Sequence, residues 1–158
     1  MDQRSLLLSF WEKEATATRK VISRIPEGST YRPDPKSRTA SEIAWLIVRE
    51  EAVLIEGLEK GRLVWDEVPL PATMKAVLDQ YDALHANLSQ RFQALDPAAW
   101  ERPVPFMFGE HEIMRDTGYA NAWGFLFDLV HHRGQLSTYL RAMGSTVPQI
   151  YGPSADEP

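Results

Sequence analysis

The stretch FDLVHHRGQLSTYLRAMG, residues 127–144, has the periodicity of a buried helix but carries several polar side chains. At about 100° per residue, a stripe about 80° wide corresponds to the core-facing surface of a helix. Its members are Phe125, Asp128, His132, Leu136, Tyr139 and Met143. The stripe predicts that Asp128 and His132 lie inside the protein, one turn apart, whereas His131 is rotated by about 100° towards the rim or the solvent.

Three further segments show helical periodicity and are separated by strong boundary signals. We therefore expect a single all-α domain over residues 1–158, a four-helix bundle. The helices are expected over about 4–25, 39–60, 71–95 and 117–143. Between the last two, residues 96–116 contain three prolines and a glycine and are expected to form a long crossover connection before the last helix.

Composition excludes several classes of protein and of site. With 44% hydrophobic and 25% charged residues and no apolar run near ~20 residues, the chain is expected to be soluble and cytoplasmic, without a membrane partner. The absence of cysteine excludes disulfides and thiolate metal sites, so any metal would be held by histidine and carboxylates. A net charge of -5 argues against a nucleic-acid partner.

The second predicted helix also directs a carboxylate into the core. One stripe of this helix contains Ile43, Leu46, Ile47, Glu50, Leu54 and Gly57. Glu50 therefore lies among apolar neighbours, whereas Glu51 is rotated towards the edge. Because an unpaired buried carboxylate is costly, Glu50 and Asp128 must have partners, change protonation or reach solvent through a cavity.

Three interpretations of this polar cluster are open. In the first, a structural network joins His132 to Asp128 or Glu50, and Gln135 bridges backbone groups. In the second, Glu50, Asp128 and His132 hold a divalent metal ion, because side chains four residues apart on one helix can share an ion that a facing helix completes. In the third, His132 and a carboxylate perform acid–base chemistry without a metal.

The last helical segment and the tail after it carry a family resemblance. The segment LVHHRGQLSTYLRAMGSTVPQIYGPSADE (129–157) resembles the C-terminal signature of the DinB-like (DinB/YfiT-like) family of four-helix-bundle proteins. The similarity extends to IPEG (25–28), YRPDPKSRTASEIAWLI (31–47) and EGLEKG (56–61). It implies an up-down-down-up arrangement, often dimeric, with a divalent metal bound by three histidines. Related thiol-dependent isomerases and transferases use that metal to activate a thiol or a substrate carbonyl.

Two of the three ligand positions implied by the resemblance are altered in this chain. Leu46 stands where the family has its first histidine, and Asp128 stands where it has the second. Only His132 is retained, so the three-histidine site is absent. Asp128 and Glu50 could replace the missing imidazoles and hold one divalent ion, Zn, Ni, Mn or Fe. Replacing imidazoles by carboxylates would favour the harder of these ions.

The expected function is that of a DinB-like protein with an altered metal site, a metal-dependent small-molecule transferase or hydrolase. The alternative is a non-enzymatic homodimeric bundle whose buried Glu-Asp-His cluster is structural. Trp45 and Trp123 fall off the core stripes of their helices, which favours a helix-mediated homodimer contact.

Four other polar side chains have simpler expected roles. The lone histidines His85 and His111 are expected at the surface or rim rather than as ligands. Arg133 is expected to pair with an acidic residue, and Tyr139 is expected to offer its hydroxyl to the central polar cluster.

Overall fold

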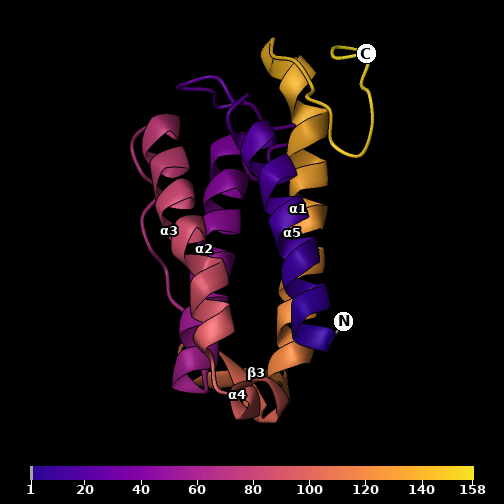
Figure 1. The fold of residues 1–158 in the computed structure, drawn as a ribbon. Helices are drawn as coiled ribbons and strands as arrows, with labels where there is room; N and C mark the ends of the chain where they lie inside the picture. The colour runs from indigo at the N-terminus through magenta and orange to yellow at the C-terminus, as the bar shows by residue number, and fades with distance from the viewer. Residues whose placement is uncertain (1) are drawn as a thin grey trace.

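The computed structural model describes residues 2–158. The four long helices are α1 (Gln3–Ile22), α2 (Ala40–Lys60), α3 (Met74–Ala94) and α5 (Gly118–Leu140). They lie side by side, with α1 and α5 running in one direction and α2 and α3 in the other (Figure 1). The short helix α4 (Pro97–Glu101) follows α3, and the 3-10 turn η1 (Arg141–Met143) follows α5.

The expectation of an all-α four-helix bundle is wrong, because the chain has a fifth helix and a three-stranded mixed sheet. The strands are β1 (Leu63–Trp65), β2 (Pro103–Phe108) and β3 (His111–Thr117), in the order β1-β2-β3. β1 pairs with β2 in parallel, and β2 pairs with β3 in an antiparallel hairpin. The predicted crossover connection over 96–116 is therefore α4 and most of this hairpin.

The prolines of β2 explain why the strand escaped prediction. Proline has no amide hydrogen to donate, so it normally argues against a central strand. Here Pro103 and Pro105 pair only with β3, because β1 reaches only the later residues 106–108 of β2. The prolines thus lie where one edge of β2 has no neighbouring strand among residues 2–158. Gly109, at φ 58°, supplies the left-handed conformation that the hairpin turn requires.

Side-chain capping moves the start of α3 from its expected position. The helix expected over 71–95 begins at Met74, because the hydroxyl of Thr73 accepts a hydrogen bond from a first-turn amide. The carboxylate of Glu27, from the loop after α1, accepts bonds from the amides of Met74 (2.8 Å) and Lys75 (2.7 Å). An anion at a helix N-terminus is favourable, so Glu27 joins this loop to α3.

The sheet is held against α2 by a close backbone approach. Gly57 of α2 faces Leu63, the first residue of β1, and both lie in the buried part of the protein. A Cβ added at Gly57 would lie 2.6 Å from Cγ and 2.7 Å from Cα of Leu63. Only glycine fits this contact, which places the sheet beside the C-terminal half of α2.

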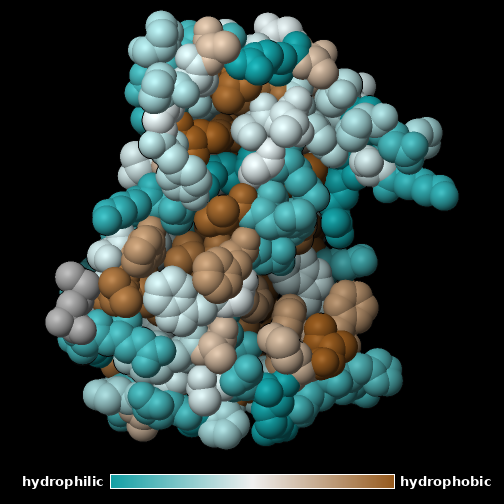
Figure 2. Space-filling model, turned by 90° about the vertical axis from the view of Figure 1, so that its right-hand side faces the viewer, coloured by the Kyte–Doolittle hydropathy of each residue, from teal (hydrophilic) through white to brown (hydrophobic). Residues whose placement is uncertain are grey.

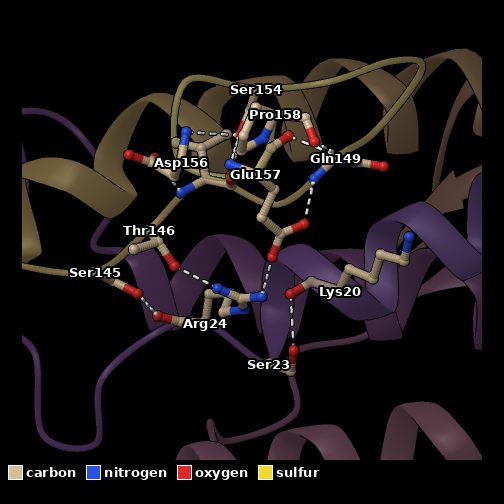
Figure 3. Close-up of polar contacts among 11 residues, drawn as sticks. Lys20, Ser23, Arg24, Ser145, Thr146, Gln149, Ser154, Asp156, Glu157 and Pro158 are labelled. Atoms are coloured by element: carbon tan, nitrogen blue, oxygen red, sulfur yellow. Dashed lines mark hydrogen bonds and ion pairs between the residues drawn. The ribbon is translucent and has the colours of Figure 1, made fainter.

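The C-terminal tail folds back over the end of α1 (Figure 3). Arg24 forms an ion pair with Glu157 and a hydrogen bond with Thr146. The Ser145 hydroxyl donates to the carbonyl of Arg24 (2.7 Å), and the Gln149 amide donates to Glu157 (2.9 Å). These contacts attach the tail to α1 despite its lack of helix or strand.

Apolar side chains gather in the lower part of the face on the α1 and α5 side (Figure 2). Phe10 of α1 is 42% exposed and Phe127 of α5 is 66% exposed. Both rings lie 6.0 Å from the ring of Trp123. An exposed group of this kind is typical of a binding or interaction surface. Separately, none of the helices within residues 2–158 is both long and apolar enough to cross a membrane.

We expect Gly57→Ala to lower the free energy of unfolding by about 1–3 kcal/mol, because the new methyl group would collide with β1. Gly134→Ala on α5 is the matched control, since a Cβ there meets nothing within 4 Å. This control should raise the free energy by about 0.5–1 kcal/mol through its better helix propensity. Urea denaturation measures both. A neutral or stabilising Gly57→Ala would contradict the close approach of α2 and β1.

Candidate metal centre

Glu50 brings a carboxylate into the contact between α2 and α5. Its apolar neighbours on the same helix face, Ile47 and Leu54, are fully buried, and Glu50 itself is only 4% exposed. Its Oε1 lies 3.4 Å from Nε2 of His132. Its other oxygen, Oε2, is buried without a hydrogen-bond partner among residues 2–158. One acceptor of a buried carboxylate therefore lacks the partner that such groups normally have.

Asp128 and His132 complete the cluster from successive turns of α5. Nε2 of His132 lies 3.5 Å from Oδ1 of Asp128. The His132 side chain is 11% exposed, as the core stripe predicts, but that of Asp128 is 55% exposed. The expectation that both lie inside the protein is therefore wrong for Asp128. Its carboxylate faces an open cleft, so the cluster has one side accessible to solvent.

The second nitrogen of the His132 ring is oriented by a neighbour on the same helix. Nδ1 of His132 lies 3.1 Å from Oε1 of Gln135, and Nε2 of Gln135 lies 3.0 Å from Nε2 of His131. An amide oxygen only accepts, so Nδ1 of His132 carries the hydrogen in this contact. In neutral His132 the lone pair is then on Nε2, the atom that faces the two carboxylates. Gln135 was expected to bridge backbone groups, but its side chain contacts the two histidines instead. Its spacing of three residues from His132 on the same helix could have predicted this contact.

These three side chains fit a divalent metal ion. One ligand atom from each of Glu50, Asp128 and His132 lies within 4.8 Å of the others. Tetrahedral zinc with bonds of about 2.0–2.2 Å needs ligand atoms about 3.3–3.6 Å apart. The distances of 3.4 Å and 3.5 Å from His132 to the two carboxylates agree with this requirement. Oε2 of Glu50, unpartnered within residues 2–158, adds a further donor.

Burial also controls the protonation of the cluster. It raises the pKa of Glu50 to about 7, the charge of Asp128 adds to the rise, and His132 opposes it. For His132, burial acts to lower the pKa, but Glu50, Gln135 and Asp128 outweigh it and raise the pKa above its ordinary 6.5. Near neutral pH the cluster therefore retains protons. A bound cation would displace them, so its affinity should increase with pH.

The cluster opens into a cleft of about 690 Å³ between α2, α5 and the sheet. Leu46, at the altered family position, lines this cleft together with Glu50, Asp128 and His132. One part of the cleft lining is an aromatic and apolar wall. It consists of Trp65, Phe106, Phe108, Met114, Phe125 and Phe127. Because most of these residues come from the unpredicted sheet, this wall was not foreseen from the sequence.

A second buried carboxylate lies on another face of α2. Glu51 was expected at the helix edge but is fully buried, so that expectation is wrong. Its Oε1 accepts a hydrogen bond from Nε1 of Trp11 (3.1 Å), and its Oε2 lies 3.6 Å from Nδ1 of His85. The other ring nitrogen of His85 lies 3.2 Å from Glu12. His85 thus lies between two carboxylates, each nearest to a different ring nitrogen, although the 3.6 Å contact with Glu51 is too long for a hydrogen bond. This geometry suits an imidazolium and not a shared metal ion.

The other singled-out residues lie apart from the metal cluster. Arg133 pairs with the buried Glu14, as expected, and both contact the hydroxyl of Tyr151. Tyr139 packs its ring edge-on against Tyr31 at 5.5 Å. Among residues 2–158, its hydroxyl forms no hydrogen bond with the cluster. His111 is exposed at the start of β3.

The two tryptophans named for a homodimer contact have different environments. Trp45 is 8% exposed, and its Nε1 donates to the carbonyl of Val68 at 2.9 Å. It is therefore covered by its own chain. Trp123 is half-buried between Phe10 and Phe127 and lies beside exposed apolar surface.

Comparison with known proteins places this geometry in context. The model of the DinB family matches residues 1–158. A Bacillus subtilis (strain 168) protein described as "uncharacterized protein YrdA" is 26% identical over 157 residues, which cover 95% of this chain and 89% of that protein.

Two solved structures share the fold. The DinB-like protein YjoA from Bacillus subtilis has a TM-score of 0.71 at 17% identity, covering 93% of this chain and 99% of that one. A DinB-like protein from Bacillus cereus has a TM-score of 0.71 at 20% identity, covering 92% and 95% of the two chains. At these identities the likeness concerns the fold alone.

The protonation of His85 should make the stability of the protein depend on pH. Partial burial lowers the pKa of His85, but Glu51 and Glu12 outweigh it and raise the pKa above 6.5. A raised folded-state pKa gives stability that is fully present below 6.5 and is lost as pH rises through the folded value. We therefore expect the stability difference between wild type and His85→Gln to shrink from pH 6 to about pH 8.5.

Urea denaturation across this pH range measures the difference. His111→Gln, which removes an exposed imidazole, is the control and should follow the wild type at each pH. A difference between wild type and His85→Gln that stays constant or grows with pH would contradict the charged bridge.

Proposed function

The chain belongs to the DinB family, and we propose that it binds one divalent metal ion through Glu50, Asp128 and His132. The observation that carries this proposal is the convergence of three donor atoms at metal-ligand spacing, beside a buried carboxylate oxygen that has no other partner within residues 2–158. We further infer that the ion acts on a small molecule held in the adjoining cleft, in a transfer or hydrolysis reaction.

The residues around the site would have different roles in such a reaction. A divalent ion, when bound, supplies Lewis acidity that polarises a carbonyl or lowers the pKa of a thiol or water. Glu50 and Asp128 offset its charge, and two carboxylates with one imidazole favour Zn, Mn or Fe over softer ions. Gln135 orients His132, and the aromatic wall reduces the access of water to the bound molecule.

The alternative of a purely structural cluster is less well supported. The buried carboxylate of Glu14 is paired, since it accepts from Arg133 and from Tyr151, although Oε2 of the buried Glu51 has no hydrogen-bond partner within residues 2–158. In the described part of the chain, Glu50 has no such set of donors, and its cluster opens into a cleft instead of the core. A homodimer through the surface of Phe10, Trp123 and Phe127 is a separate proposal. It involves none of the three metal ligands, although Phe127 also lines the cleft.

We expect metal-free wild-type protein, purified without a His tag, to bind about one equivalent of zinc. His132→Ala should weaken zinc binding at least ~100-fold, because it removes the only imidazole in the set. Calorimetric titration measures affinity and stoichiometry, and His111→Ala is the matched control that should bind like wild type. Binding of less than about a tenth of an equivalent of zinc by wild type, or an unchanged zinc affinity in His132→Ala, would contradict the proposal.

A gain-of-binding variant tests the position of the site from the opposite direction. Leu46 lines the same cleft as the three proposed ligands and lies one helical turn before Glu50 on α2. Leu46→His combined with Asp128→His should bind zinc or nickel at least ~10-fold more tightly than wild type, because imidazole suits both ions. Competition with a chromogenic chelator provides the measurement. A folded double variant with no gain would show that position 46 does not face the centre.

A further inference from the structure

We propose that the cleft over the metal centre binds a small organic anion with a flat apolar body, the anionic group on Arg38 and the body on the aromatic wall. The inference deepens the proposed function and rests on it for the place of the reacting group, which would lie near Glu50, Asp128 and His132. Binding by Arg38 and the wall can nevertheless be measured separately from metal binding.

Arg38 is a cation at one end of the cleft that forms no ion pair within the described residues. It is exposed just before Thr39, the N-cap of α2, and it lines the cleft that holds the candidate ligands. Among residues 2–158, the arginines in ion pairs are Arg19, Arg24, Arg91, Arg115, Arg133 and Arg141. The Arg38 guanidinium is therefore not held in an ion pair, although it lies near enough to Glu42 for their charges to interact. Its planar fork suits a carboxylate.

The adjoining space also places Arg38 beside the centre. A cavity of about 490 Å³ is lined by Arg38 and Lys36 on one side and by His132 and Gln135 on the other. Arg38 thus borders the metal cluster both in the main cleft and in this side cavity. Lys36 lines only the side cavity, so Arg38 is the cation that a ligand in the main cleft would meet.

The opposite end of the cleft provides apolar surface that a ligand would cover. Phe108 of β2 is 54% exposed and Met114 of β3 is 46% exposed, although both line the cleft. Trp65 of β1 and Phe127 of α5 extend the same wall. Concave sites with aromatic walls and a few polar groups are the usual form of small-molecule sites. Flat aromatic rings favour a flat apolar body.

The order of these groups along α2 fits a single ligand. Glu50 lies ten residues after Ala40, the first residue of α2, or about 15 Å along the helix at 1.5 Å per residue. The long Arg38 side chain spans part of that distance. The sheet packs against α2 at Gly57, beyond Glu50, so the metal cluster lies between the cation and the sheet residues of the aromatic wall. The cleft of about 690 Å³ has the size of small-molecule sites.

Charge explains why an anion should bind and why the metal should help. The negative charges of Glu50 and Asp128 cancel the charge of a divalent ion. The positive charge that then remains for a ligand in the cleft is that of Arg38. Without the ion, Glu50 and Asp128 repel an anion when they are ionised. Metal and anion should therefore strengthen each other's binding, and this coupling is reciprocal.

The test uses two probes that differ in one group, 2-naphthoate and the neutral 2-naphthylmethanol. Zinc-loaded wild-type protein should bind the carboxylate about five- to tenfold more tightly by calorimetry. Arg38→Gln should remove this preference, whereas the exposed Arg32→Gln is the matched control and should keep it. Phe108→Ala should weaken both probes alike, by about fivefold, because it removes wall area and no charge.

Three outcomes would overturn the inference: equal binding of the two probes, no binding of either at millimolar concentration, or a preference that survives Arg38→Gln. The last result would place the carboxylate on the ion instead of Arg38. Repeating the titrations after chelation separates the two proposals. An Arg38-dependent preference in protein that takes up no zinc supports the anion site and contradicts the metal site. Zinc uptake without an Arg38-dependent preference supports the metal site and contradicts the anion site.

Discussion

A carboxylate buried without a full set of partners is the constraint around which this protein is arranged. Glu50 lies in the α2–α5 contact, and removing an ionised carboxylate from water costs several kcal/mol unless another group compensates. His132 and Asp128 surround it from α5, but neither binds its second oxygen. A proton or a divalent cation can compensate the cost. The three ligand atoms lie within 4.8 Å of one another, close enough to share one cation.

Within residues 2–158, three buried carboxylates lie in three different environments. Glu14 is paired with Arg133, and Glu51 is shared between Trp11 and His85. Of these three, Glu50 is the one that lines the large cleft beside the sheet. Oε2 of Glu51 also lacks a hydrogen-bond partner within residues 2–158, so incomplete pairing alone does not distinguish Glu50. What distinguishes Glu50 is its access to the large cleft, which the sheet lines with aromatic side chains.

The candidate site was more predictable from the sequence than the fold around it. Helical periodicity identified Glu50 and His132 as inward-facing, because each lies in a stripe of apolar neighbours. The same method failed for Glu51, because α2 packs against both α3 and α5 and therefore buries more than one face. It failed in part for Asp128, which lies at the border between core and cleft. The sheet was missed because the prolines of β2 are typical of a loop. They fit a strand only because β1 pairs with residues 106–108 and leaves the prolines without a neighbour on that edge. Distances between helices depend on packing, which no single-helix pattern contains.

The most direct test of the central claim is anomalous X-ray diffraction from crystals of zinc-loaded protein at the zinc edge. We expect one strong peak bonded to Glu50, Asp128 and Nε2 of His132 at about 2.0–2.2 Å, with at least one position open towards the cleft. A peak at other side chains, or no peak at full zinc loading, would contradict the assignment of these residues as a metal centre.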